Sequence, residues 1–233
     1  MRSCGRFIRC YRRDDKPRRL EPGWGLGDAH GHTPHHGRPR WGVLLNDWDS
    51  TARFLLNHHF GYVFGPETLS WYFLRDAVAP EHWAWLWSEG VSLGLFRHGH
   101  LYRGTAEALD NLAGLGRLVV VTHRPESATR DTLAWIAYHE LPVSEIHLLT
   151  SETPKSRVQP WCDVCVDDSP TVVEDLAAHT PSLVLVWDRP WNQGVTSGER
   201  VYSWLDVIRR VRKLKIVKRG RVAWRTTRVN RTS

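Results

Sequence analysis

The sequence has no long apolar run, and this absence excludes two classes of protein. No stretch approaches the roughly 18–20 consecutive apolar residues that a membrane-spanning helix needs, although 41% of the 233 residues are hydrophobic. The arginine-rich N-terminus also lacks the apolar stretch of a secretory signal. We therefore expect a cytoplasmic protein with no membrane partner. The length of 233 residues suits one sizeable domain with an inserted subdomain.

Cysteine is scarce: the four residues do not make a disulfide framework. Cys162 and Cys165 form a C-x-x-C pair, which is compatible with a redox pair or with half of a zinc site. The histidines within residues 30–36 are candidates for further zinc ligands, but nothing in the sequence fixes their geometry. Because the pair leads directly into a buried-strand pattern, we interpret both cysteines as small hydrophobic core residues.

Acidic residues are missing from the C-terminal end of the chain. From Arg209 onward there are 11 basic residues and no acidic one, and residues 1–40 hold 10 Lys/Arg against 4 Asp/Glu. The net charge of +7 therefore combines two basic ends with a body, residues 41–208, whose net charge is −10. Basic ends can bind nucleic acid, but we favour a pair of solvated, mobile ends.

The composition divides the chain into four parts. Arg, Gly, Pro and His dominate the N-terminal part without apolar periodicity, which predicts a disordered leader. An unusually aromatic part follows, and its breaks at Gly65-Pro66, Ala79-Pro80 and Gly90 predict short helices. The predicted parts are a basic leader (1–40), a core (41–51 and 105–208), a helical cap (52–104) and a basic tail (209–233).

Strand and helix patterns alternate in the core. Apolar runs of strand length are separated by amphipathic segments, which is typical of an α/β fold with a parallel sheet covered on both faces. The predicted strands are 42–46, 117–122, 145–150, 162–167 and 182–187, and the predicted helices are 106–112, 127–139, 171–179 and 201–211.

Polar side chains follow two of these strands where they end. Thr122 ends one strand, the pair Asp167-Asp168 ends another, and Lys155 lies in the loop before it. Ligands of such sheets bind beyond the carboxyl ends of the strands. A hydroxyl and an ammonium can hold phosphate oxygens, and adjacent carboxylates suit a hard cation such as Mg²⁺.

The order of these residues resembles motifs two, three and four of the haloacid dehalogenase (HAD) superfamily of phosphatases. Asp188-Arg-Pro-Trp-Asn192 is similar to a signature of the 5'(3')-deoxyribonucleotidase family and its bacterial and phage relatives, as are Leu101–Leu109 and Val121-Thr-His-Arg-Pro125. The likeness covers roughly residues 42–208 and implies a Rossmann-like HAD core, with a small helical cap inserted after the first strand. It also implies Mg²⁺-dependent hydrolysis of nucleoside monophosphates in nucleotide metabolism.

The resemblance also assigns binding residues. It implies that Thr122, His123 and Lys155 bind phosphate and that Asp167 and Asp168 bind the metal. In such relatives cap aromatic residues pack on the base, a role that Trp71, Phe73, Trp83 or Trp85 would take here. The alternative interpretation is that these rings form the hydrophobic core of the cap itself.

The first motif of such phosphatases, Asp-x-Asp after the first strand, has two placements. In one, Asp47 is the nucleophile, Asp49 is the general acid and base, and both contribute to the metal site. In the other, Gly42-Val-Leu-Leu-Asn-Asp-Trp48 matches the segment just after the catalytic pair, so that Pro39 and Trp41 occupy the catalytic positions. The chain would then have no nucleophile.

Three functions follow from these alternatives. The first is a hydrolase, a 5'-nucleotidase that acts on (deoxy)nucleoside monophosphates through an aspartyl-phosphate. The second is a catalytically impaired relative that binds a nucleotide at most, and the third is a nucleic-acid-end phosphatase that uses the basic ends. The expected partner is a small phosphorylated substrate, and a homodimer is compatible with the sequence.

Overall fold

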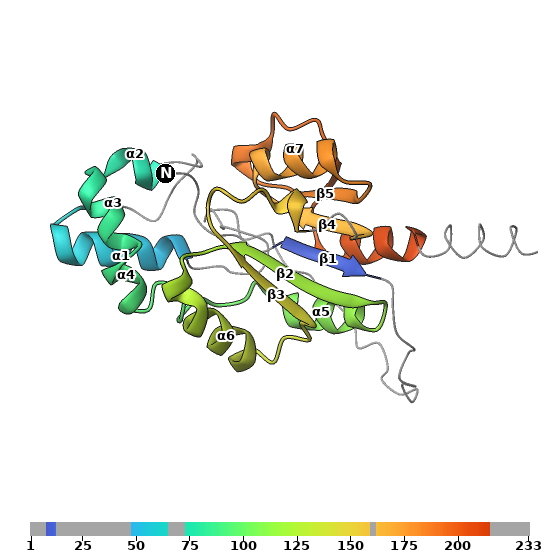
Figure 1. Cartoon of the computed structure of the whole chain (residues 1–233), viewed down its shortest axis with the longest axis horizontal. Helices are drawn as coiled ribbons and strands as arrows, with labels where there is room; N and C mark the ends of the chain where they lie inside the picture. Colours follow the sequence, from blue (N-terminus) through green and yellow to red (C-terminus); the bar gives the residue numbers. More distant parts are fainter. Residues whose placement is uncertain (1–7, 13–47, 65–72, 159–161, 215–233) are drawn as a thin grey trace, which may run out of the picture.

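The computed structural model describes residues 8–12, 48–64, 73–158 and 162–214 (Figure 1). Its strands are β1 (Ile8–Arg12), β2 (Arg117–His123), β3 (Glu145–Leu149), β4 (Val164–Asp167), β5 (Leu183–Trp187) and β6 (Glu199–Val201). Its helices are α1 (Trp48–Phe60), α2 (Phe73–Ala77), α3 (Pro80–Leu86), α4 (Glu89–Ser92), α5 (Thr105–Ala113), α6 (Thr129–Tyr138) and α7 (Pro170–His179). Single 3-10 turns are η1 (Glu126–Ala128), η2 (Lys155–Arg157) and η3 (Pro190–Asn192), and residues 204–214 are helical.

The strands form one six-stranded sheet in the order β3-β2-β1-β4-β5-β6. The pairs β2–β3, β4–β5 and β5–β6 are parallel. Helix α6 connects the first pair, α7 connects the second, and a link that contains the 3-10 turn η3 connects the third. Crossover helices cover the faces of such sheets, and β2, β4 and β5 are accordingly buried along nearly their whole length and have apolar sequences. The predicted α/β fold with a Rossmann-like core is confirmed.

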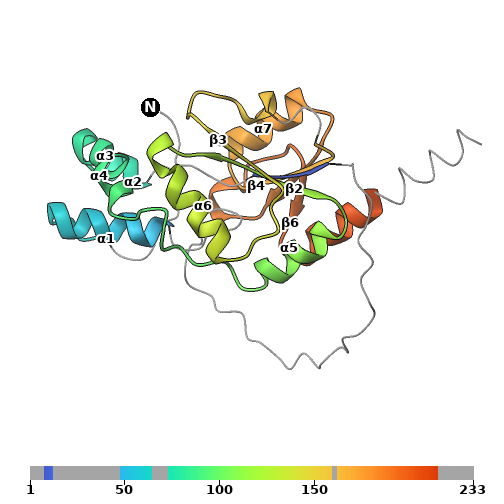
Figure 2. The same cartoon turned by 60° about the horizontal axis from the view of Figure 1, so that its bottom comes forward.

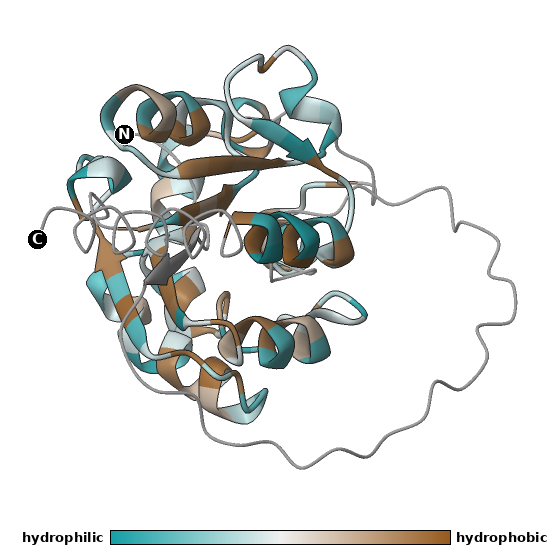
Figure 3. Cartoon of the chain, turned by 90° about the vertical axis from the view of Figure 1, so that its right-hand side faces the viewer, coloured by the Kyte–Doolittle hydropathy of each residue, from teal (hydrophilic) through white to brown (hydrophobic). Residues whose placement is uncertain are grey.

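Each face of the sheet has its own hydrophobic cluster, because successive side chains of a strand point to opposite faces. Leu118 and Val120 of β2 pack with α5 and with the helical residues 204–214, whereas Val119 and Val121 pack with α7. Figure 3 shows hydrophobic residues along several of the strands, and both hydrophobic and polar residues on the helices. The cysteines Cys162 and Cys165 are buried in the second cluster, which agrees with their interpretation as core residues.

The C-terminal helical segment begins at a capped turn and lies beside α5 (Figure 2). The Ser203 hydroxyl accepts the Asp206 backbone N–H at 3.2 Å and donates to the Asp206 carboxylate at 2.8 Å, an arrangement close to a capping box. The second of these bonds lowers the pKa of the Asp206 carboxyl. At the next residue, the Trp204 indole N–H donates to the buried Thr105 hydroxyl of α5 at 2.9 Å.

Helices α1 to α4 lie together at one side of the molecule, beyond the sheet (Figures 1 and 2). The predicted break at Ala79-Pro80 is confirmed, since α3 begins at Pro80. The break predicted at Gly90 is wrong, because Gly90 lies inside α4. A Cβ at that position would come within 3.1 Å of Leu86 Cδ1, so the glycine allows α3 and α4 to pack closely. Helix α1 begins at Trp48, four residues before the predicted start of the cap.

The centre of the sheet differs from the sequence-based expectation. Residues 1–40 were predicted to contain no ordered element, but Ile8–Arg12 form β1 between β2 and β4. This strand runs antiparallel to both neighbours, with Ile8 opposite Val121 and Arg9 opposite Val166. Parallel strands that follow one another in the chain are joined by crossover connections, usually helices. Strand β1 precedes all of the crossover helices, so none of them fixes its direction. The predicted strand 42–46 lies outside the described residues.

The direction of β1 determines what it can supply to the carboxyl edge of the parallel strands. Its amino end lies at that edge, next to the ends of β2 and β4. No acidic residue occurs before Asp14. Neither β1 nor the seven residues before it can therefore place a carboxylate there.

The described helices are too short or too polar to span a lipid bilayer.

The bond between Trp204 and Thr105 predicts a stability effect. Thr105→Val removes a buried acceptor of the indole N–H and should lower the free energy of unfolding by about 1–3 kcal/mol, measured by urea denaturation. Thr129→Val is the matched control, because the Thr129 hydroxyl is exposed and bonds only within its own turn. Equal effects of the two substitutions would contradict a role for Thr105 in anchoring the C-terminal helical segment.

Candidate functional site

A fully buried ion pair lies at the carboxyl edge of the sheet. Lys155 Nζ is 3.2 Å from Asp167 Oδ2, and neither side chain is exposed to solvent. The other carboxylate oxygen of Asp167 accepts the Ser169 backbone N–H at 2.7 Å. Unpaired charges are very costly to bury, so Lys155 and Asp167 require each other. The structure thus brings together two of the predicted site residues.

Local structure fixes both partners of this pair. Strand β4 ends at Asp167, and Pro170 begins α7 with the fixed φ that suits the first helical position. Lys155 begins the turn η2, whose next residue, Ser156, is held by Asp175 of α7. Asp175 accepts the Ser156 backbone N–H at 3.1 Å and the Ser156 hydroxyl at 2.8 Å. The sequence analysis missed Asp175, which looks like an ordinary acidic residue of a solvated helix face.

Thr122 lies at the same edge, on β2. Its hydroxyl is fully buried, and Oγ1 has no hydrogen-bond partner among the described residues. The strands β2 and β4 flank β1, so their backbones are about 10 Å apart, which is two strand spacings. Buried hydroxyl groups nearly always have a partner. A hydroxyl in this position fits an acceptor supplied by a ligand, such as a phosphate oxygen.

The two residues after Thr122, His123 and Arg124, contact neighbouring loops and helix α6. The His123 ring Nε2 is 2.9 Å from the Thr153 carbonyl oxygen, two residues before Lys155. Arg124 lies with its guanidinium 4.4 Å from the ring centroid of Phe96 and donates to the Thr132 hydroxyl at 2.8 Å. Arg124 therefore joins the segment that leaves the cap to α6. Phosphate binding by His123 stays a prediction.

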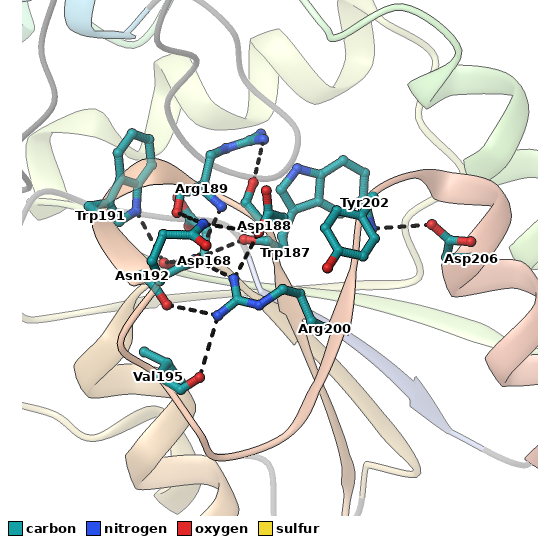
Figure 4. A network of polar contacts seen from close by, with 11 residues as sticks. Asp168, Trp187, Asp188, Arg189, Trp191, Asn192, Val195, Arg200, Tyr202 and Asp206 are labelled. Carbon is teal, nitrogen blue, oxygen red and sulfur yellow. Dashed lines mark hydrogen bonds and ion pairs between the residues drawn. The ribbon is translucent and has the colours of Figure 1, made fainter.

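The segment Asp188–Asn192 approaches the acidic pair from β5 (Figure 4). The carbonyl oxygen of Asp168 accepts the Trp191 indole N–H at 3.2 Å and the Asn192 amide N–H at 3.0 Å. Arg200 of β6 in turn donates to Asp188 and to Asn192. The sequence analysis did not single out Arg200, because it follows a loop and belongs to no recognised motif.

The acidic residues fit a divalent cation by the chemistry of their donors. Asp167 and Asp168 are adjacent, fully buried and at the edge where ligands of such sheets bind. Carboxylate oxygens are the ligands that Mg²⁺ prefers. Among the described residues, no group of three or more His, Cys, Asp or Glu side chains could hold a metal. Within that part of the chain, the pair is thus only a partial ligand set.

Of the two candidate catalytic aspartates, the structure describes only Asp49. Asp47 lies outside the described residues, directly before α1. Asp49 is in the first turn of α1, where its carboxylate is buried and Oδ2 accepts from Arg53 Nε at 2.7 Å. Asp49 does not join Asp167 and Asp168 in a metal-binding group. The catalytic and metal-binding roles of Asp47 and Asp49 stay predictions.

The cap aromatics contact one another. Trp83 packs edge-on against Trp87, with ring centroids 5.6 Å apart, and Trp85 packs edge-on against Phe60 at 4.9 Å. Both indoles are only partly buried. These contacts fit the alternative left open by the sequence, in which the rings form part of the hydrophobic core of the cap. Base stacking by Trp83 and Trp85 stays a prediction. Trp71 and the side chain of Phe73 lie outside the described residues.

Comparisons with known proteins agree with this geometry. The sequence model of a family described as "5' nucleotidase, deoxy (Pyrimidine), cytosolic type C protein" matches residues 42–217, about three quarters of the chain. A protein of Oceanobacillus iheyensis named as a putative nucleotidase is 27% identical over 128 residues, which are 53% of this chain and 68% of that protein. The matched family range begins at Gly42, so β1 lies outside it.

The buried ion pair predicts that the substitutions Lys155→Met and Arg75→Met lower the free energy of unfolding by different amounts. Lys155→Met leaves the Asp167 charge buried without its cation and should destabilise the protein by about 3–5 kcal/mol in a urea titration without added metal. Arg75→Met is the control: it removes an ion pair with Asp76 that is largely exposed, and its effect should stay below about 1 kcal/mol. A change of similar size in both variants would show that Asp167 does not depend on Lys155.

Proposed function

The chain belongs to the family of cytosolic type C 5'-nucleotidases, and from this we propose that it hydrolyses the phosphomonoester of (deoxy)nucleoside monophosphates with Mg²⁺. One observation carries the proposal. A buried lysine, two buried carboxylates and a buried hydroxyl without a partner among the described residues gather at the carboxyl edge of the sheet. This combination offers donors to phosphate oxygens and oxygen ligands to a hard cation.

The proposed roles divide between binding and chemistry. Lys155, Thr122 and His123 bind phosphate oxygens, and Asp167 and Asp168 hold the cation. Bound Mg²⁺ would supply positive charge that offsets the charge of the phosphate oxygens. The fixed Lys155–Asp167 pair keeps the ammonium group in place before substrate arrives, so its attraction for phosphate needs no rearrangement.

The chemical step in this proposal uses the first placement of the Asp-x-Asp motif. A carboxylate oxygen of Asp47 forms a bond to phosphorus as the bond to the leaving nucleoside oxygen breaks, giving an aspartyl-phosphate. Asp49 donates a proton to the leaving oxygen and then accepts one from the water that releases phosphate. The pairing of Asp49 with Arg53 in the structure requires this carboxyl to change partners before it can act as an acid.

The substrate end of the proposal rests on the cap. Partly buried rings of Trp83 and Trp85 offer flat apolar surface on which a base can stack, and Trp71 and Phe73 are the other candidates. The name of the matched family supports a pyrimidine deoxynucleotide as the first substrate to test, and a cytoplasmic location. A homodimer stays a prediction.

A second candidate function is favoured by a specific observation. The strand at the centre of the sheet is antiparallel, and it and the residues before it contain no carboxylate. If Asp47 is not the nucleophile, the remaining groups would bind a nucleoside monophosphate without hydrolysing it. A nucleic-acid-end phosphatase that uses the basic ends is a weaker candidate, because the sequence contains no base-reading motif.

A phosphate-release assay separates the first two functions. The purified chain with Mg²⁺ should release inorganic phosphate from deoxynucleoside monophosphates, and Asp47→Asn should lower kcat by about a thousandfold or more. Asp28→Asn, a change of the same kind in the leader, should leave kcat unchanged. Full activity of Asp47→Asn would remove Asp47 from the mechanism. Absence of turnover in the unmodified chain, with nucleotide-dependent stabilisation, would support the binding protein instead.

Thr122 gives a test that separates ligand binding from folding. Thr122→Val keeps the shape of the side chain and removes a hydroxyl that has no partner among the described residues. The free energy of unfolding should therefore stay equal or rise, whereas inhibition by inorganic phosphate should weaken about tenfold, the loss of one hydrogen bond to a charged group. Thr132→Val is the control, because the Thr132 hydroxyl bonds to Ala128 and Arg124. Unchanged phosphate inhibition in Thr122→Val would exclude Thr122 from the phosphate site.

A further inference from the structure

Arg200 lies at the centre of the turn that follows β5, and four hydrogen bonds connect it to this turn (Figure 4). Its Nη1 donates to Asp188 Oδ1 at 2.9 Å and to Asn192 Oδ1 at 2.8 Å. Its Nη2 donates to the carbonyl oxygens of Asn192 at 2.9 Å and of Val195 at 3.4 Å. A planar guanidinium can hold these acceptors at once, whereas an ammonium is a single point charge.

Asn192 connects Arg200 to the acidic pair. The Asn192 side chain is buried and uses its full hydrogen-bonding capacity, which is two N–H donors and two acceptor lone pairs. Nδ2 donates to the carbonyl oxygens of Trp187 at 2.8 Å and of Asp168 at 3.0 Å. Oδ1 accepts the Arg189 backbone N–H at 3.1 Å and one N–H of Arg200. No aspartate or glutamine could make this set without losing a donor or moving the amide.

The carbonyl of Asp168 is thus fixed by two donors from the same turn, Asn192 Nδ2 and Trp191 Nε1. Asp168 is fully buried, and its peptide group determines where its carboxylate points. Loss of a group that orients a metal ligand typically weakens metal binding roughly ten- to a hundredfold, and Mg²⁺ demands near-ideal octahedral geometry.

We propose that Arg200 is a positioning residue of the cation site, which acts through Asn192 on the backbone of Asp168. The segment Asp188-Arg-Pro-Trp-Asn192 then holds the backbone of the acidic pair in place. Asp188 anchors the guanidinium, Pro190 begins the turn, and Trp191 and Asn192 supply the two donors. This inference rests on the proposed function, since it concerns the same cation.

The test is the dissociation constant for Mg²⁺, measured by isothermal titration calorimetry on the full chain without substrate. Arg200→Met should weaken Mg²⁺ binding roughly ten- to a hundredfold. Arg200→Lys keeps the charge beside Asp188 but loses the fork, and should weaken binding by a smaller factor. Arg210→Met is the matched control: it removes a half-exposed ion pair with Glu199 of the same strand, and should change the constant less than twofold.

Thermal unfolding of each metal-free variant separates positioning from stability. A lower Tm of Arg200→Met with wild-type Mg²⁺ affinity would reduce Arg200 to a structural residue and overturn the proposal, leaving the cation site intact. If Arg200→Met does not fold, wild-type affinity in Arg200→Lys would overturn it. Absence of Mg²⁺ binding by the unmodified chain would overturn both this proposal and the cation site of the proposed function.

Discussion

The buried pair of Lys155 and Asp167 is the constraint on which the rest of the site depends. Neither charge is exposed, and Lys155 Nζ lies 3.2 Å from Asp167 Oδ2. If the loop that carries Lys155 moved away from the end of β4, the Asp167 charge would be left in the interior without the lysine, at a high cost in free energy. Two further contacts hold this loop, from Asp175 to Ser156 and from His123 to Thr153. Groups of the chain itself therefore hold this edge together, which suits a site that presents a fixed ammonium group to phosphate.

Around this pair, the molecule assigns different tasks to neighbouring elements. Strand β2 brings a buried hydroxyl, β4 brings the carboxylates, and the turn after β5 fixes the peptide of Asp168 through Asn192 and Arg200. The cap is attached to the core by the stacking of Arg124 on Phe96 and by an ion pair between Arg97 and Asp131 at 2.8 Å. Trp83 and Trp85 pack against the hydrophobic cluster that the cap helices share with one face of the sheet.

The centre of the sheet sets a limit on the chemistry. A parallel strand in this position would end at the ligand-binding edge and could place a carboxylate there, as the Asp-x-Asp motif requires. Strand β1 is antiparallel and presents its amino end instead, in a segment without acidic residues. The family range begins only at Gly42. In the function proposed above, hydrolysis therefore depends on Asp47, which precedes the first helix of the cap in the sequence.

The sequence by itself determined the fold class and the polar residues of the edge. Buried parallel strands require continuous apolar runs, and the carboxyl ends of such strands meet at one edge, so Thr122, Lys155 and Asp167-Asp168 could be predicted from order alone. Only the tertiary structure decided which strand fills the centre, that Asp49 pairs with Arg53, and that Arg200 supports Asp168. Strand direction and contacts between distant residues carry no local pattern: Asp175 and Arg200 look like ordinary surface charges until the fold brings them beside their partners.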